Sequence, residues 1–132
     1  MVENDYVMRI IHEMVRTLVK LLFGIDEVKE EELGFEAQES GDLFRRLREM
    51  AKDGKINEAE NLLSDVLDEQ ETGSLRLEYM KVALFFYDYL NGKSNEFLES
   101  CDYSREEIRE GIRSTMLRYG YGELAETWGD QW

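Results

Sequence analysis

Residues 53–63, Asp-Gly-Lys-Ile-Asn-Glu-Ala-Glu-Asn-Leu-Leu, decide the fold of this chain. Gly54 can adopt the left-handed conformation that ends many helices, and Asn57 can begin a new helix by accepting a hydrogen bond from the Glu60 amide. The Glu60 carboxylate can reach back to Asn57, so the pair predicts a capping box. Helices joined by about three or four residues lie antiparallel. The stretch therefore predicts a helical hairpin.

Helical periodicity continues on both sides of this turn. Apolar residues share one face before it (Leu43, Phe44, Leu47, Met50, Ala51) and after it (Ala59, Leu62, Leu63, Val66, Leu67). Further helices are expected over about 5–23, whose wide apolar stripe favours a central place in the core, and over 75–90. A short helix is expected near 95–99, and a Ser104 to Glu107 capping box opens another, to about Tyr119. The chain has no proline and 132 residues, which predicts one all-α domain, 1–132, a bundle of about five to six helices.

The segment 43–67 resembles a tetratricopeptide unit. Gly54 and Ile56 match its turn, and Ala59 takes the small-residue position of its second helix. The motif Gly-Lys-Ile-Asn-Glu at 54–58 recurs as Gly-Lys-Ser-Asn-Glu at 92–96. Two interpretations stay open: a repeat, or two turns that share the same stop and start chemistry. One unit and a fragment are too few for a superhelical groove.

The whole chain also resembles a family of short bacterial proteins of unknown function, found in Gram-positive species. The resemblance rests on Asp-Tyr-Val-Met-Arg-Ile-Ile at 5–11, the motif at 54–63, and Phe-Tyr-Asp-Tyr-Leu-Asn at 86–91 before Ser-Arg-Glu-Glu-Ile at 104–108. It implies a cytoplasmic helical protein and supplies no activity.

Two segments stand apart from the helical pattern. Residues 26–41 carry many acids and few apolar residues, which predicts an acidic connector, with Leu33 and Phe35 packed on the core. Residues 120–132 begin with two glycines and hold Trp128 and Trp132. Such aromatic side chains are costly to leave in water, so we expect this tail to fold back or to meet a partner.

The net charge of −14 excludes several functions. All of the excess negative charge follows residue 25, and this field repels phosphate backbones and anionic lipids. We expect neither nucleic-acid nor membrane binding, and the only apolar run near the N-terminus, 18–25, is too short to span a bilayer. The single cysteine, Cys101, cannot form an intrachain disulfide, which favours the cytoplasm.

No catalytic, metal or cofactor site is expected. His12 is the only histidine, and a zinc site needs three or four ligands. Residues 68–79 resemble a calcium loop until the position that requires a bidentate glutamate, which is Tyr79. Glu106, Glu107 and Glu110 suit the first turns of a helix better than acid–base chemistry. Cys101 has no adjacent base to lower its pKa, so we expect a quiet thiol.

The tyrosines and phenylalanines of residues 79–89 favour core packing, with a protein interface or a small-molecule pocket as the alternatives. Apolar side chains in excess of what a small core needs must be covered by something, which favours a function in protein binding. We expect a non-catalytic protein–protein interaction module that binds a protein partner or a second copy of itself as a homodimer. Its expected contact surface includes Phe85, Phe86, Tyr89, Trp128 and Trp132. The alternative is a small-ligand-binding protein or enzyme with an aromatic pocket between helices.

Overall fold

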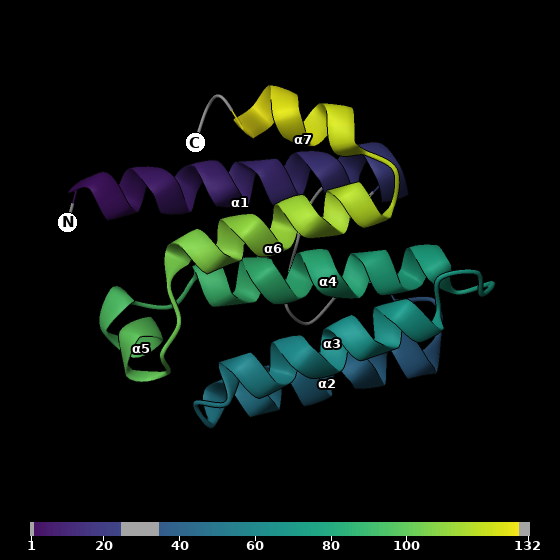
Figure 1. The fold of residues 1–132 in the computed structure, drawn as a ribbon, viewed down its shortest axis with the longest axis horizontal. Coiled ribbons are helices and arrows are strands. Elements are labelled where there is room, and N and C mark those ends of the chain that lie inside the picture. The colour runs from purple at the N-terminus through teal and green to yellow at the C-terminus, as the bar shows by residue number, and fades with distance from the viewer. Residues whose placement is uncertain (1, 25–34, 130–132) are drawn as a thin grey trace.

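The computed structural model describes residues 2–24 and 35–129, with side chains for 6–24 and 35–127. These residues form seven helices and no strand, which confirms the all-α prediction with a slightly higher helix count. The helices are α1 (Val2–Phe23), α2 (Gln38–Lys52), α3 (Ile56–Glu69), α4 (Arg76–Asn91), α5 (Asn95–Ser100), α6 (Arg105–Arg118) and α7 (Gly122–Gly129) (Figure 1).

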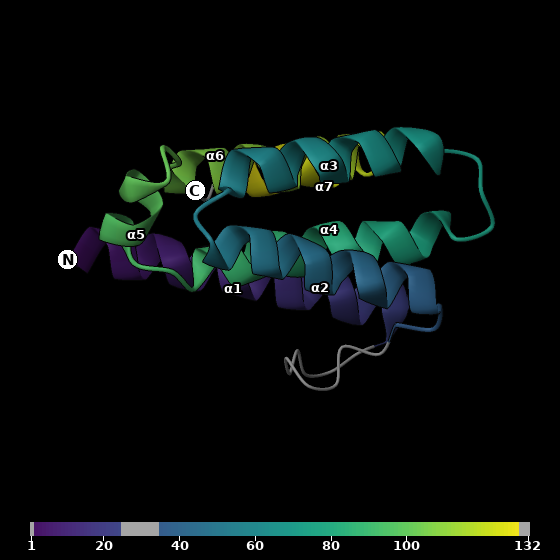
Figure 2. The same cartoon turned by 90° about the horizontal axis from the view of Figure 1, so that it is seen from below.

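Helix α4 lies at the centre of the bundle. It contacts α1, α2, α3 and α6, and in Figure 2 it lies between α1 and α2 on one side and α3, α6 and α7 on the other. Eleven of its 16 residues are buried, as expected of a helix that is apolar on all sides. The central place expected for the first helix was therefore wrong, because α1 exposes polar side chains such as Arg9, Glu13 and Arg16 along one face.

Helices α2 and α3 pack against each other and form the expected hairpin. Gly54 has a φ of +84°, the left-handed conformation predicted for it. The predicted capping box of α3 is wrong, since the helix begins at Ile56 and its N-cap residue, Lys55, makes no side-chain capping bond. Asn57 Nδ2 instead donates to the carbonyl oxygens of Cys101 and Asp102, at 3.3 and 3.2 Å. The turn was predicted correctly, but Asn57 serves a contact between distant segments.

Helix α6 does begin with the predicted capping box. The Ser104 side chain accepts from the Glu107 amide, and the Glu107 carboxylate accepts from the Ser104 amide at 2.8 Å. The sequence-based prediction succeeded here because both partners lie within one helical turn.

The N-terminus of α2 is capped by a residue of α4. Glu78 Oε1 accepts from the backbone amides of Glu36 and Ala37 and from Ser40 Oγ, and Glu78 Oε2 pairs with buried Lys81 at 2.8 Å. Burial raises the pKa of Glu78, but the hydrogen bonds from Lys81, Ser40 and the Glu36 amide outweigh it and the pKa lies below its usual value. This contact fixes where the chain enters α2.

The acidic connector is only partly within the described residues. Residues 26–34 lie outside them, including Leu33, whereas 38–41 already belong to α2. Phe35 packs on the core as expected, with ring centroids 5.7 Å from those of Phe44 and Phe85.

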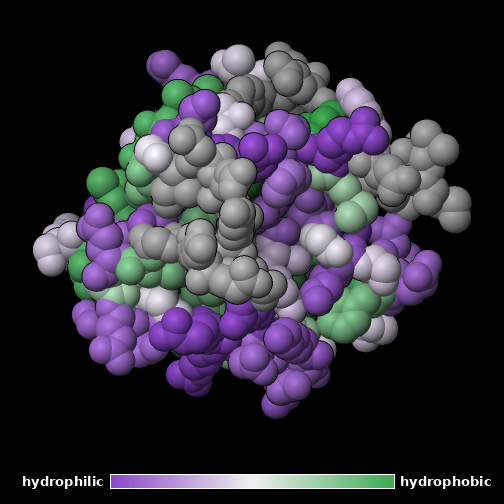
Figure 3. Space-filling model, turned by 180° about the vertical axis from the view of Figure 1, so that it is seen from behind, coloured by the Kyte–Doolittle hydropathy of each residue, from purple (hydrophilic) through white to green (hydrophobic). Residues whose placement is uncertain are grey.

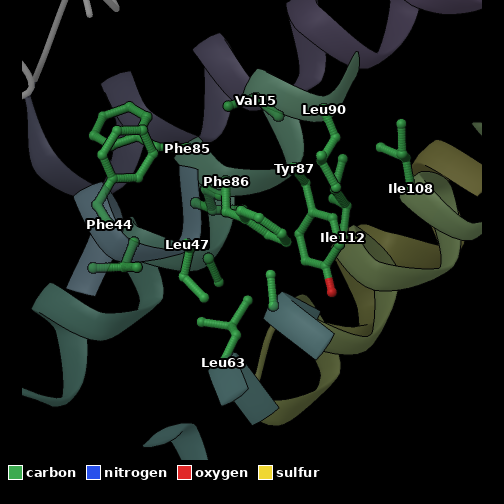
Figure 4. Packing of buried hydrophobic residues seen from close by; sticks show 14 of the residues in the cluster. Val15, Phe44, Leu47, Leu63, Phe85, Phe86, Tyr87, Leu90, Ile108 and Ile112 are labelled. Atoms are coloured by element: carbon green, nitrogen blue, oxygen red, sulfur yellow. The ribbon is translucent and has the colours of Figure 1, made fainter. Parts of the chain in front are cut away.

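The hydrophobic core joins all layers of the bundle. Figure 4 shows side chains of α1, α2, α3, α4 and α6 meeting around Phe86, which is fully buried. The surface seen in Figure 3 is mostly hydrophilic, and hydrophobic side chains gather only in small groups between polar ones.

The described part of the C-terminal tail folds back onto the bundle, which was one of the two alternatives expected for it. Residues 122–129 form α7, which packs against α6, and Ala125 is buried there. The Trp128 side chain and residue Trp132 lie outside the described part of the chain.

Candidate functional site

A groove runs between α3 and α6, and its volume is about 370 Å³. Such a volume lies in the range of ligand-binding clefts. Helix α3 contributes Glu60, Asn61, Leu63, Ser64 and Leu67, and α6 contributes Glu107, Glu110, Gly111, Ser114, Thr115 and Arg118. Tyr87 of α4 completes the lining. Except for two leucines and a glycine, the residues that line the groove are polar.

Gly111 admits the Tyr87 ring into this region. A Cβ atom at Gly111 would lie 2.2 Å from Tyr87 Cζ, far inside contact distance. Figure 4 shows the Tyr87 ring beside Ile112, which follows Gly111 in α6. A glycine within a helix costs about 1 kcal/mol relative to alanine, and the packing of Tyr87 explains its presence here.

The Tyr87 hydroxyl meets a carboxylate of α3. Tyr87 and Tyr103 both donate to Glu60 Oε2, at 2.8 and 3.0 Å, and both tyrosines are buried. Burial, followed by the negative charge of Glu60, raises the pKa of both phenols well above the usual value. Both hydroxyls therefore remain protonated donors at neutral pH, and they hold Glu60 in one orientation.

The groove carries more negative than positive groups. Its carboxylates are Glu60, Glu107 and Glu110, and its one cation is Arg118. Arg118 already pairs with Asp68 of α3, with Nη1 and Oδ1 2.6 Å apart. Glu110 lies 4.0 Å from the exposed guanidinium of Arg113, and Glu107 accepts from Ser104. The lining still carries more carboxylates than cations, and this excess is suited to a positively charged ligand.

A second polar pair joins α1 to α4. His12 Nδ1 lies 2.9 Å from Asp88 Oδ1. Burial raises the pKa of Asp88, although the hydrogen bond and the charge of His12 oppose that rise. No group of three or more potential metal ligands occurs in the described residues.

The other residues with candidate chemistry have local roles. Cys101 is a buried free thiol, and the segment between α3 and α4, which resembles a calcium loop in sequence, is a helix-to-helix turn. Glu106 pairs with Arg109 within α6, and Glu107 caps that helix. Of the three acids considered together, Glu107 and Glu110 line the groove.

Three of the five side chains expected to contact a partner are described, and two of these three lie in the core. Phe85 and Phe86 are 2% and 0% exposed, so in this fold they support the core and are not available to a partner. Tyr89 is partly buried, and its hydroxyl is buried without a hydrogen-bond partner. Trp128 and Trp132 have no described side chains.

Comparison with known protein families shows which family the chain belongs to. The model of a family of unknown function, DUF6483, matches residues 1–120. The chain belongs to this family. No curated protein and no solved structure matches this DUF6483 member. Among its described helices, none combines the length and the apolar character that a membrane crossing requires.

The Glu60 site in this DUF6483 member was not foreseen from sequence. Tyr87 is 27 positions and Tyr103 is 43 positions from Glu60, and no local pattern links residues at such distances. Gly111 is the one signal that sequence offered, since an interior helix glycine often marks a close approach.

Proposed function

We propose that this DUF6483 protein is a non-catalytic protein-interaction module, and that the groove between α3 and α6 holds a positively charged segment of its partner. The observation that supports this proposal most directly is the charge of the groove. Three carboxylates line it against a single guanidinium, which is paired with Asp68. One of the carboxylates, Glu110, also lies 4.0 Å from Arg113. Charge complementarity of this kind steers association and selects the partner.

The lining favours binding over catalysis. The hydroxyls of Tyr87 and Tyr103 are committed to Glu60, and their raised pKa makes them weak acids at neutral pH. The small-ligand alternative shares the same cationic chemistry, with a free amine in place of a protein side chain. A peptide that contacts the length of the groove should bind more tightly than a free amine.

A titration with matched peptides tests the proposal. Three nine-residue peptides that differ only in carrying lysines, glutamates or serines are added to the ¹⁵N-labelled protein. We expect the lysine peptide alone to shift the amide signals of Ser64, Gly111 and Thr115 in a saturable manner. Equal shifts from the serine peptide, or tighter binding of free n-butylamine than of the lysine peptide, would contradict a basic protein partner.

Two double variants separate the groove from the general charge of the protein. Glu107→Gln with Glu110→Gln removes two groove charges, and glutamine still serves in the capping box of α6. We expect roughly twofold to fivefold weaker binding per charge removed. The control is Glu58→Gln with Glu99→Gln, two exposed residues outside the groove lining, with the same change in net charge. A similar loss of peptide affinity in both double variants would mean that binding depends on the net charge of the protein and not on the groove.

Several finer interpretations also remain our proposals. The α2–α3 hairpin is proposed to be tetratricopeptide-like, supported by the left-handed Gly54 and the fully buried Ala59. A Gram-positive bacterial origin and a cytoplasmic location are proposed on sequence grounds, as is a homodimer. Tyr89, Trp128 and Trp132 stay proposed contacts, and light scattering of the purified chain measures whether it self-associates.

A further inference from the structure

The two carboxylate oxygens of Glu60 differ in their hydrogen bonding. Oε2 accepts from both Tyr87 and Tyr103, whereas Oε1 accepts no hydrogen bond from any described residue. Glu60 is partly exposed and lines the groove. The carboxylate is thus anchored at one oxygen and keeps acceptor capacity at the other.

This asymmetry discriminates between the two cationic side chains of proteins. A guanidinium binds a carboxylate best through two parallel hydrogen bonds, one to each oxygen. Two tyrosine hydroxyls already use Oε2, so the paired geometry is obstructed. A primary ammonium is a compact point charge with three donors, and one free oxygen is sufficient for it.

We propose that Glu60 is the recognition point for a primary ammonium group, the end of a lysine side chain on the partner, and that it selects lysine over arginine. The inference rests on the proposed function of the groove and names its ligand. Leu63 and Leu67 follow Glu60 at helical spacing on the same lining. Both leucines are buried, at 2% and 4% exposed, so the Glu60 carboxylate itself makes the contact with the ammonium group.

Gly111 and Tyr87 together fix the orientation of the Glu60 carboxylate. The missing Cβ at Gly111 allows the Tyr87 ring to reach the groove, where its hydroxyl orients Glu60 at 2.8 Å. Tyr87 and Tyr103 are therefore positioning residues, because they act on the ligand through the carboxylate. A purely structural Glu60 would only accept hydrogen bonds from the two phenols, and a glutamine oxygen can also accept them.

The test uses n-butylammonium and n-butylguanidinium as probes on the full chain. Binding is measured from the amide shifts of Leu63, Gly111 and Thr115 in ¹H–¹⁵N spectra. We expect the wild-type protein to bind butylammonium several-fold more tightly than butylguanidinium, and Glu60→Gln to weaken butylammonium by roughly tenfold. Equal or tighter binding of butylguanidinium, or unchanged binding in Glu60→Gln, would overturn the inference.

Tyr103→Phe gives a readout that a structural role would not change. The substitution removes one donor from Oε2, so this oxygen can take part in a paired contact with a guanidinium. We expect the preference for butylammonium to fall at least twofold in Tyr103→Phe, chiefly through tighter binding of butylguanidinium. An unchanged ratio of the two affinities contradicts the proposed role of the tyrosines.

The outcomes separate this inference from the proposed function. If the lysine peptide binds, and loses affinity in the Glu107 and Glu110 double variant but not in Glu60→Gln, the groove function holds and the Glu60 inference fails. If no peptide binds in the groove, the proposed function itself fails. Circular dichroism checks the fold of each variant, and the wild-type ratio of probe affinities decides the question even if Glu60→Gln does not fold.

Discussion

At the scale of single residues, atoms far apart in the sequence determine the roles of Glu60 and Asn57. Each was expected to help begin α3, and each instead bonds to a side chain or carbonyl from another part of the chain. A polar side chain near a helix start has local backbone partners, but a buried tyrosine hydroxyl competes for it, because an unsatisfied buried hydroxyl costs about 1–3 kcal/mol. Hydrogen bonds to distant residues therefore replaced the local capping bonds at the start of α3.

Gly111→Ala should destabilise the protein although alanine favours helices. The new Cβ would lie 2.2 Å from the Tyr87 ring, so the ring must move away from Glu60. We expect a net loss of about 1–3 kcal/mol in the free energy of unfolding, measured with urea. The control is Gly41→Ala in α2, where the added Cβ meets only ordinary contacts at 3.5 Å or more, and which should not destabilise. Equal behaviour of the two variants would contradict the packing argument.

The stability of the protein should fall above about pH 10. Tyr87 and Tyr103 have pKa values raised by burial and by Glu60, so the unfolded chain loses these phenol protons first as the pH rises. Their contribution to the free energy of unfolding is constant below the unfolded pKa and decreases above it. Urea midpoints between pH 8 and pH 11 measure this fall. It should be smaller in Tyr103→Phe, and a midpoint that is flat to pH 11 would contradict the burial of these phenols.

At the scale of helices, one of the two predicted capping boxes forms and the other does not, and the difference shows when distant contacts override local ones. The Ser104 and Glu107 box involves residues of one turn and was confirmed. The Asn57 and Glu60 box has the same spacing and does not form. The difference lies outside these helices, because Asn57 and Glu60 bond to residues 27 to 45 positions away. Ser104 bonds to Glu107 within the first turn of its own helix.

Ser104→Ala should weaken α6 specifically. The Ser104 hydroxyl accepts from the Glu107 amide at 3.3 Å, and loss of an N-cap typically costs about 1 kcal/mol. Urea unfolding measures the loss. Ser114→Ala, at an exposed position within the same helix, is the control and should change stability by less than about 0.5 kcal/mol. A loss of the same size at both positions would mean that the cap does not contribute.

At the scale of the whole molecule, polar contacts tie the outer helices to α4. Asn91 Nδ2 donates to the Met8 carbonyl of α1 at 2.8 Å, and Asn91 Oδ1 accepts from Arg105 of α6 at 2.9 Å. Arg105 also donates to the carbonyls of Asn91 and Lys93. The Asn91 carbonyl is among the acceptors that the C-terminus of α4 leaves unpaired. One buried asparagine therefore joins three helices.

Asn91→Ala should loosen α1 more than α3. The Met8 carbonyl loses its side-chain donor, and we expect a cost of about 1–3 kcal/mol. Native-state hydrogen exchange measures the effect by helix, and the amides of α1 should exchange faster than those of α3. Asn61→Ala, at an exposed site on α3, is the control. Uniform acceleration of all helices would show that α1 does not open separately.

The sequence by itself determined what depends on neighbours within about one helical turn. It specified the all-α class, the turn at Gly54 and the box at Ser104, because periodicity, glycine conformation and capping are local properties. It further predicted that Phe35 is packed on the core, but not its partners Phe44 and Phe85. It also showed an aromatic surplus in residues 79–89, but it could not tell whether that surplus faced the core or a partner.

Only the tertiary structure decided which helix is central and where polar groups meet. Helix α4 is central because it carries apolar side chains around most of its circumference and buries eleven of its 16 residues, so Phe85 and Phe86 are internal. The groove, the two tyrosines on Glu60 and the space at Gly111 depend on how α3, α4 and α6 are aligned. Those contacts join residues 24 to 43 positions apart, and their geometry arises from packing of the whole core, which no local pattern of residues encodes.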